Sequence, residues 1–256
     1  MGRHKRVIAY TALHYGADYL AYAVRSVIDH IDQYYVLYSP APSHGHRGGS
    51  VPIPKRESRD NIHAIAKQAA GEKLIWVDGD WTHEGQQRDY IYHVAPDADV
   101  ILVLDSDEIW HSRLIERVMF AARFAKSDDV TRLRIPIIHY WRSFSRCVLH
   151  DPAFPERVIF PQVVNGQTQT LGASYPINHM GYAIRPDLMR YKLSIHGHKN
   201  EFPDIDTWYQ DTFLANAQVD CHPIGSEYWN PETVNPLDHM PEFMVEHPFY
   251  GKNVIE

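Results

Sequence analysis

Two aspartates separated by one residue follow an uninterrupted apolar run. Asp105 and Asp107 come directly after residues 100–104, which read Val-Ile-Leu-Val-Leu. Such a run is typical of a strand buried on both faces of a parallel sheet, and ligands bind such sheets beyond the carboxyl ends of their strands. Carboxylates at positions i and i+2 leave a strand in the same direction. The pattern predicts that one carboxylate holds Mg²⁺ or Mn²⁺ while the other holds a ribose or a metal-bound water, and the alternative is a solvated turn.

Arg88 is the candidate for a phosphate contact near these carboxylates. It lies on the helix expected to lead into the apolar strand. A guanidinium suits a diphosphate, because its fork of donors matches phosphate oxygens. Glu84 precedes it by four residues, a spacing that favours an ion pair along one helix face. The two roles are compatible, and we expect Arg88 to have both.

Residues after two other predicted strands give further candidates. Thr11, Leu13 and His14 follow the first strand, where backbone and side chains would face a nucleotide base and ribose at the sheet edge. Asp78 follows the third strand and could accept a hydrogen bond from uracil or ribose. The alternatives are a plain loop position for His14 and a capping role for Asp78.

The elements that position these residues alternate along the first half of the chain. The predicted strands are 6–10, 34–38, 73–77 and 100–104, and the predicted helices are 18–31, 61–70 and 86–95. This alternation predicts an α/β fold with a doubly wound, mostly parallel sheet.

The second half has less periodicity, and we expect an irregular region there. It is predicted to contain helices at 111–126, 186–194 and 205–218, strands at 131–138 and 157–164, and a loop at 165–175. The simplest organisation is one domain over 1–256, in which 1–110 binds a nucleotide and 111–256 shapes an acceptor site and completes the metal site.

Composition narrows the class of protein. The chain has 256 residues, a net charge of −7 and 12% aromatic residues, so it is not disordered as a whole and is not a general nucleic-acid coat. No run of about 18 apolar residues exists, and no apolar signal segment precedes the first strand. The two cysteines give no disulfide framework. We therefore expect no membrane span and a cytoplasmic location.

Several motifs in order resemble a known enzyme group. The segment from Asp99 to Trp110 is similar to the Asp-x-Asp motif of GT-A glycosyltransferases. Together with Glu84 and Arg88-Asp89 it resembles glycosyltransferase family 17, the β-1,4-mannosyl-glycoprotein N-acetylglucosaminyltransferase type, and also family 2. Two later blocks extend the resemblance: His179-Met-Gly-Tyr is similar to a late metal-ligand histidine of family 2, and the block from Lys192 to Glu201 is similar to one of family 17.

The resemblance implies a GT-A fold and a metal-dependent transfer of a sugar from a nucleotide-sugar, expected to be a UDP-sugar, to an acceptor hydroxyl with inversion. Asp105, Asp107 and His179 would bind Mn²⁺ or Mg²⁺, and His198 would contact the diphosphate. Glu156 is the candidate base that deprotonates the acceptor, with a plain surface position beside Arg157 as its alternative. The acceptor is not readable, and a glycan, a protein, a small molecule or a modified nucleic-acid base each fits.

Three other classes remain open at this point. A nucleotidyltransferase can use a similar sheet and carboxylate pair, but it would need a glycine-rich phosphate loop with a basic residue, which Thr11 to Gly16 do not supply. A His-rich metal-dependent hydrolase would use paired histidines, as at His44/His46 and His196/His198. A non-catalytic sugar-binding module is the third alternative.

Overall fold

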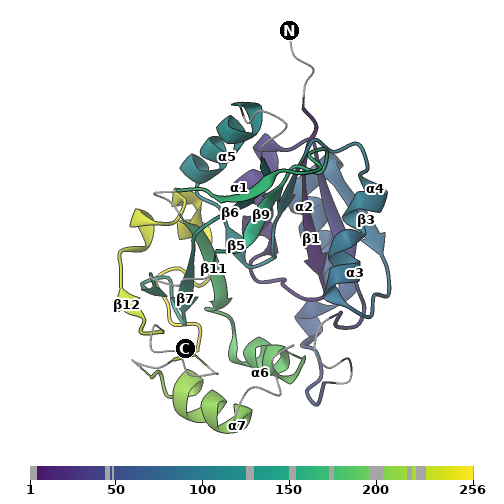
Figure 1. Ribbon diagram of the computed structural model, residues 1–256. Helices are drawn as coiled ribbons and strands as arrows, with labels where there is room; N and C mark the ends of the chain where they lie inside the picture. Colours follow the sequence, from purple (N-terminus) through teal and green to yellow (C-terminus); the bar gives the residue numbers. More distant parts are fainter. Residues whose placement is uncertain are drawn as a thin grey trace.

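The computed structural model describes residues 5–43, 47, 49–124, 130–149, 154–172, 176–195, 204–217, 221–222 and 229–255 (Figure 1). The helices are α1 (Leu20–Val27), α2 (Arg59–Ala70), α3 (Glu84–Asp89), α4 (Ile91–Val94), α5 (Ser112–Phe124), α6 (Pro186–Ile195) and α7 (Ile205–Thr207). The strands are β1 (Val7–Leu13), β2 (Gln33–Tyr38), β3 (Leu74–Asp78), β4 (Val100–Val103), β5 (Glu108–Ile109), β6 (Val130–Arg134), β7 (Ile137–Trp141), β8 (Arg146–Val148), β9 (Glu156–Ile159), β10 (Gln167–Thr170), β11 (Ile177–Tyr182) and β12 (Glu232–Thr233).

The larger sheet has the strand order β10-β6-β9-β4-β1-β2-β3. Its neighbouring strands pair in parallel except where β9 lies between β4 and β6, because β9 is antiparallel to both. The carboxyl ends of β4, β1, β2 and β3 therefore share one edge of the sheet. This arrangement confirms the predicted α/β class with a Rossmann-like, mostly parallel sheet flanked by helices.

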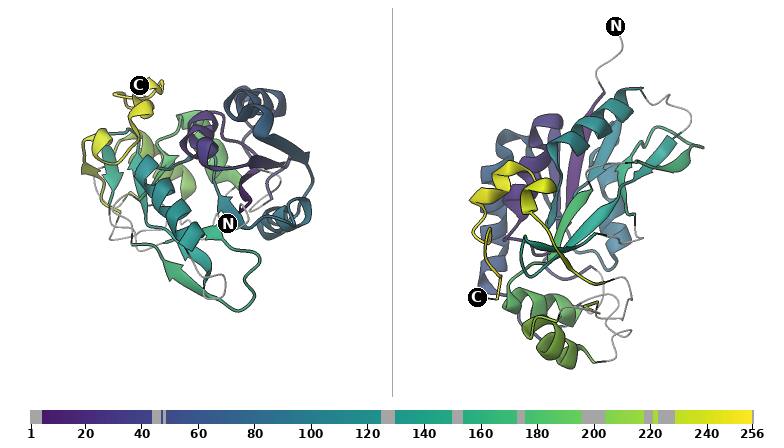
Figure 2. Two further views of the ribbon diagram at one scale, coloured as in Figure 1. Left: turned by 90° about the horizontal axis from the view of Figure 1, so that it is seen from above. Right: turned by 90° about the vertical axis from the view of Figure 1, so that its left-hand side faces the viewer.

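The apolar run before the two aspartates is buried on both faces, as predicted. Val100, Leu102 and Leu104 belong to the apolar cluster that includes α1, α2 and α5. Ile101 and Val103 point to the other face and pack in the cluster that contains α4. Figure 2 shows the helices distributed over both faces of the strands. Because β4 is enclosed on both sides, the residues that follow it emerge at a fixed point of the sheet edge.

The second half of the chain is more regular than its sequence predicted. It contains most of a second sheet with the order β12-β8-β7-β11-β5. The strand predicted at 131–138 is divided between the two sheets: β6 ends at Arg134 and β7 begins at Ile137. Pro136 lies between them, and proline cannot donate a hydrogen bond to a neighbouring strand, so the chain leaves one sheet there and enters the other.

Three other predicted elements differ in detail. The helix predicted at 86–95 is divided into α3 and α4 at Tyr90. The loop predicted at 165–175 contains the exposed strand β10. The helix predicted at 205–218 begins as α7 and continues as a π-helix over Trp208–Leu214. Aromatic residues there are buried for packing, which hydrophobic periodicity alone does not reveal.

None of the helices in the described part of the chain combines the length and the apolar character that crossing a bilayer requires.

Candidate functional site at the carboxyl edge of the larger sheet

The two aspartates lie in a tight turn between β4 and β5. The main-chain N–H of Leu104 donates to the carbonyl of Tyr10 at 2.9 Å, which keeps the end of β4 against β1. The N–H of Glu108 then donates to the carbonyl of Asp105 at 3.1 Å and closes the turn. β5 pairs with β11, so that Glu108 lies opposite His179. The turn therefore joins the two sheets at the point where the carboxylates emerge.

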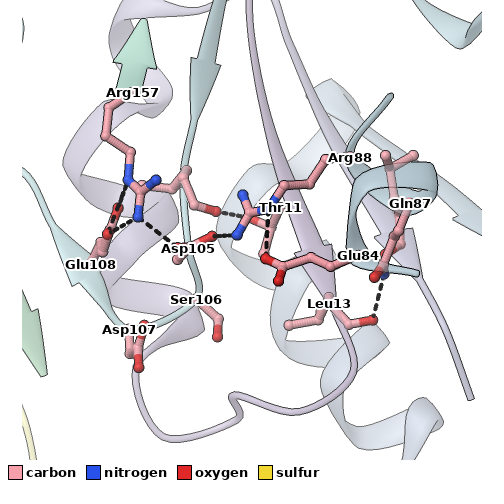
Figure 3. Close-up of polar contacts among 12 residues, drawn as sticks. Thr11, Leu13, Glu84, Gln87, Arg88, Asp105, Ser106, Asp107, Glu108 and Arg157 are labelled. Atoms are coloured by element: carbon pink, nitrogen blue, oxygen red, sulfur yellow. Dashed lines mark hydrogen bonds and ion pairs between the residues drawn. The ribbon is translucent and has the colours of Figure 1, made fainter. Parts of the chain in front are cut away.

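Asp105 is held between two arginines (Figure 3). Nη2 of Arg88 donates to Oδ1 of Asp105 at 3.0 Å, and Nη2 of Arg157 donates to Oδ2 at 2.8 Å. Burial would raise the pKa of Asp105, but the two guanidinium groups outweigh burial and hold this pKa below its usual range. Arg88 also donates from Nε to Glu84 at 2.7 Å, so the ion pair predicted from the i, i+4 spacing is confirmed.

Glu108 completes this group of charges inside the protein. Its carboxylate is 1% exposed and accepts from Nε and Nη2 of Arg157 at 2.8 and 2.6 Å. Burial raises the pKa of Glu108 although Arg157 acts in the opposite direction. We call Arg88, Asp105, Glu108 and Arg157 the arginine cluster. Both oxygens of Asp105 and both oxygens of Glu108 accept hydrogen bonds from these arginines. The main effect of the arginine cluster is therefore to fix the turn.

Asp107 has looser partners on the other side of the turn. Its Oδ2 lies 3.5 Å from Nε2 of His179 and 3.9 Å from Nζ of Lys192. Burial would raise the pKa of Asp107, but His179 and Lys192 outweigh it and hold this pKa well below its usual range. We call Asp107, His179 and Lys192 the Asp107 cluster. Its separations are longer than those of a good hydrogen bond, so these three groups are less closely paired than those of the arginine cluster.

Gly181 is needed for this approach of His179 and Lys192. A Cβ atom at position 181 would lie 2.4 Å from Cε1 of His179 and 2.9 Å from Nζ of Lys192. The carbonyl of Gly181 also accepts a hydrogen bond from Nζ of Lys192 at 3.1 Å. Nδ1 of His139 lies 2.7 Å from Nδ1 of His179 and fixes the orientation of that ring. The His-Met-Gly-Tyr motif thus supplies both a side chain and the space beside it.

The loop after β1 lies against the same turn. Gly16 has a φ of +143°, and a Cβ there would lie 2.2 Å from Oγ of Ser106. The N–H groups of Gly16 and Ala17 both donate to Oε2 of Glu57, at 2.8 and 2.9 Å. Glu57 belongs to the short 3₁₀ turn Lys55–Glu57 and is 1% exposed. The loop therefore binds an anion that belongs to the protein itself.

The residues predicted after β1 are mostly engaged inside the fold. The Thr11 side chain is fully buried, and its hydroxyl lies 2.6 Å from both the Tyr34 hydroxyl and the Leu104 carbonyl. Leu13 is 1% exposed. His14 is half-buried, with Nδ1 2.9 Å from the Ser39 carbonyl. Their contact with a nucleotide stays a prediction, and the burial of the Thr11 and Leu13 side chains leaves main-chain atoms to make it.

Two other predicted residues lie in separate ion pairs. Asp78 accepts from Nε and Nη2 of Arg59 at 2.7 and 2.6 Å, and this arginine lowers the pKa of Asp78. β1 and β2 separate its strand from β4. Glu156 accepts from Arg132 at 2.7 Å, and its side chain is 28% exposed. His198 lies outside the described residues.

Two residues of the site were not predicted as members of it. Lys192 was named only as the start of a block that resembles family 17, and Arg157 only as the neighbour of Glu156; neither has a spacing relation to the aspartates in the sequence. β9 brings Arg157 to Asp105 because β9 runs antiparallel to β4 and begins near its end. α6 brings Lys192 to Asp107. Only the pairing of distant elements reveals these contacts.

Comparisons of the sequence with known proteins do not assign the chain to a family. No family model matches the chain, and no curated protein matches it. Among solved structures, 4-diphosphocytidyl-2C-methyl-D-erythritolsynthase from Anaerococcus prevotii DSM 20548 matches with a TM-score of 0.41 and 9% sequence identity, covering 73% of this chain and 96% of that chain. That enzyme is a nucleotidyltransferase. The likeness is too distant to carry its activity over to this chain.

These findings correct the predicted resemblance to GT-A glycosyltransferases. The solved structure is a nucleotidyltransferase, and no family model of any glycosyltransferase matches. The prediction of a sugar transfer to an acceptor hydroxyl is therefore wrong. The physical reason lies in the motif: an Asp-x-Asp at the end of a buried strand indicates oxygen ligands near phosphates, but it does not indicate which bond is broken. Whether Glu156 acts as a base is not tested by these comparisons.

Proposed function

We propose that the chain is an enzyme that binds a nucleoside triphosphate at this sheet edge and transfers the nucleotidyl group to a phosphate oxygen of an acceptor. The new bond joins that oxygen to the α-phosphorus, the bond from the α-phosphorus to the bridging oxygen breaks, and pyrophosphate leaves with the electron pair. The supporting observation is the Asp107 cluster, in which a carboxylate, an imidazole and an ammonium group meet at the end of the central strand with separations of 3.5 and 3.9 Å.

The donor set fits a divalent cation that is shared with the substrate. Among the residues that the structure describes, no three His, Cys, Asp or Glu side chains are grouped to hold a metal ion. Asp107 and His179 are two potential ligands, and Mg²⁺ commonly takes one or two protein ligands and completes its shell with substrate phosphates and water. The imidazole favours Mn²⁺. Such a cation would reduce the negative charge of the phosphates.

The cationic side chains have separable tasks in this proposal. Lys192 places a positive charge beside Asp107 and suits the departing pyrophosphate, because an ammonium group binds phosphate as a point charge. Arg88 is 27% exposed, so its guanidinium is still accessible to a phosphate while it holds Asp105. Arg157 is 12% exposed and keeps the turn in place. The chain's own groups therefore bind and orient the phosphates.

The sequence lacks the glycine-rich basic loop that such an enzyme was expected to need after β1. In this chain the N–H groups of Gly16 and Ala17 after β1 already donate to Glu57. We therefore place the phosphates on the other side of the turn, between Arg88 and Lys192. The proposal needs no anion at the loop after β1.

The test is binding and turnover with the four common nucleoside triphosphates and either Mg²⁺ or Mn²⁺. Calorimetry should show metal-dependent binding of at least one nucleotide. With that nucleotide and metal present, at least one acceptor from a panel of sugar phosphates and polyol phosphates should cause release of pyrophosphate from the nucleotide. Asp107→Asn and Lys192→Met should weaken both, whereas Asp60→Asn, which alters an exposed aspartate on α2, should not. Absence of metal-dependent binding by all four nucleotides, or release of orthophosphate in place of pyrophosphate, contradicts the proposal.

A further inference from the structure

A cavity lies beyond the end of β7, and the Asp107 cluster does not line it. It has a volume of about 410 Å³, within the range of small-molecule sites. Its walls come from residues 141–146, which connect β7 to β8, and from the C-terminal segment 250–253. The main-chain N–H of Val254 donates to the carbonyl of Arg142 at 2.8 Å and ties the two walls together. No described residue of the arginine cluster or the Asp107 cluster lines this cavity.

The cavity wall carries an excess of positive charge. Among the described residues that line it, Arg142, Arg146 and Lys252 are cationic and none is acidic. Arg146 donates to neutral acceptors, the Asn216 side-chain oxygen at 3.0 Å and the Pro231 carbonyl at 3.4 Å. A guanidinium held by neutral groups keeps its full charge available to an anion. The wall therefore favours a negatively charged ligand.

The backbone around the cavity adopts unusual conformations. Arg142 and Asn216 have φ values of 56° and 60°, and they are the non-glycine residues with positive φ in the described part of the chain. Gly251, with a φ of 70°, lies on the same wall. Such conformations are uncommon for side chains other than glycine and gather at ligand sites, where packing enforces them. Two such residues, Arg142 and Asn216, lie on the wall of this one cavity.

Aromatic residues supply the rest of the surface. Trp141 is fully buried, and within the described structure its indole N–H has no hydrogen-bond partner. Its ring lies against Trp208 and Phe213, so Trp141 packs behind the cavity wall and does not offer this N–H to a ligand. Phe144 and Tyr250 also line the cavity, with ring centroids 6.2 Å apart. Apolar rings beside cationic groups suit a ligand with both an apolar and a charged part.

We propose that this cavity binds a small organic anion, carrying a phosphate or carboxylate group on an apolar body. Arg146 and Lys252 contact the anionic group, and Tyr250, which the buried Phe144 supports from behind, contacts the apolar part. The site is independent of the nucleotide site proposed above, because the two share no side chain.

The test uses phenyl phosphate and benzoate as probes, with phenol as their neutral counterpart, and calorimetry on the full chain. Arg146→Met should weaken binding of the better anion by about tenfold. Lys252→Gln, at an exposed position where folding is not at risk, should weaken it by about threefold. Lys67→Gln, an exposed lysine on α2, should bind like the wild type. Comparing the two anions shows whether the group is a phosphate or a carboxylate.

The outcomes separate this site from the sheet edge. Lys192→Met should leave probe binding unchanged, because Lys192 belongs to the Asp107 cluster. If Lys192→Met removes binding while Arg146→Met and Lys252→Gln do not, the probes bind at the sheet edge and the cavity proposal is overturned. Equal binding of phenol and phenyl phosphate, or no saturable binding of either anion, also overturns it. None of these outcomes measures binding of a nucleoside triphosphate, so the cavity proposal can fail while the proposed nucleotide site stands, and the reverse.

Discussion

The two carboxylates of the Asp-x-Asp turn, two residues apart, lie in different environments. Asp105 accepts charge-assisted hydrogen bonds of 2.8 and 3.0 Å from two arginines. Asp107 has its nearest basic side chains, His179 and Lys192, at 3.5 and 3.9 Å. The arginine cluster is closely paired, whereas the groups of the Asp107 cluster lie farther apart. The two sides of the turn therefore differ in how tightly their charges are paired, and variants on each side can test the contribution to stability and the proposed binding separately.

The largest expected effect is on stability and comes from the arginine cluster. Arg157→Met removes the cation that pairs with the buried Glu108, and breaking a buried pair by removing one partner costs about 3–5 kcal/mol. Urea unfolding at pH 7 measures this loss. Arg132→Met is the matched control on β6, where the pair with Glu156 is 49% and 28% exposed and contributes about 1 kcal/mol or less. Equal losses in the two variants would show that Arg157 does not hold the turn.

The next effect separates binding from folding. Asp107→Asn should lower nucleotide-dependent turnover by about 100-fold or more, because the variant loses the negative charge between His179 and Lys192. Its free energy of unfolding should fall by less than that of Arg157→Met. Steady-state kinetics and urea unfolding of the same preparations give both numbers. A variant that is as unstable as Arg157→Met but retains turnover would reverse the comparison.

A smaller effect is expected from the glycine beside the Asp107 cluster. Gly181→Ala places a methyl group within 2.4 Å of the His179 ring, which must shift, and we expect turnover to fall by about tenfold. Gly172→Ala is the control, because a Cβ there meets no atom within 4 Å. Turnover assays on both variants decide the matter, and unchanged turnover in Gly181→Ala would mean that the position of His179 is unimportant.

The smallest effect concerns acid. The pKa of Asp107 is lower in the folded chain than its ordinary value of 3.8, so its ionised form stabilises the fold above that pH. This contribution is lost progressively as the pH falls below 3.8. The part that is lost by pH 3 amounts to about 1 kcal/mol. Comparing urea unfolding at pH 5 and pH 3 should therefore show a smaller decrease in Asp107→Asn than in the wild type. An identical decrease would show that His179 and Lys192 do not stabilise this carboxylate.

The sequence predicts the first half of the fold well because its signals are local. The apolar run at 100–104 reports burial on both faces, and the i, i+4 spacing of Glu84 and Arg88 reports an ion pair along one helix face. The proximity of His179 to Asp107 was also expected, although through a family resemblance that proved wrong. The apolar run and the Glu84–Arg88 pair depend only on neighbours in the chain or on a single buried strand, which is why the sequence reveals them.

The rest depends on contacts between distant segments. Arg157 and Asp105 are 52 residues apart, and their contact requires that β9 run antiparallel beside β4. The second sheet consists mostly of strands of two to six residues, too short for a period of two to stand out in the sequence. The predicted strand is divided at Pro136. The sequence shows the proline there but does not show that two sheets meet at this point.

The carboxylate of Glu57 has a consequence for selectivity. It is attached to the same chain as the amides of Gly16 and Ala17 and lies 2.8–2.9 Å from them, so it acts as an internal competitor at high effective concentration. A free phosphate reaching that loop must displace a tethered rival and leave it buried without its two donors. The two N–H groups of the loop after β1 are therefore already satisfied by a carboxylate of the chain, which disfavours binding of a second anion there.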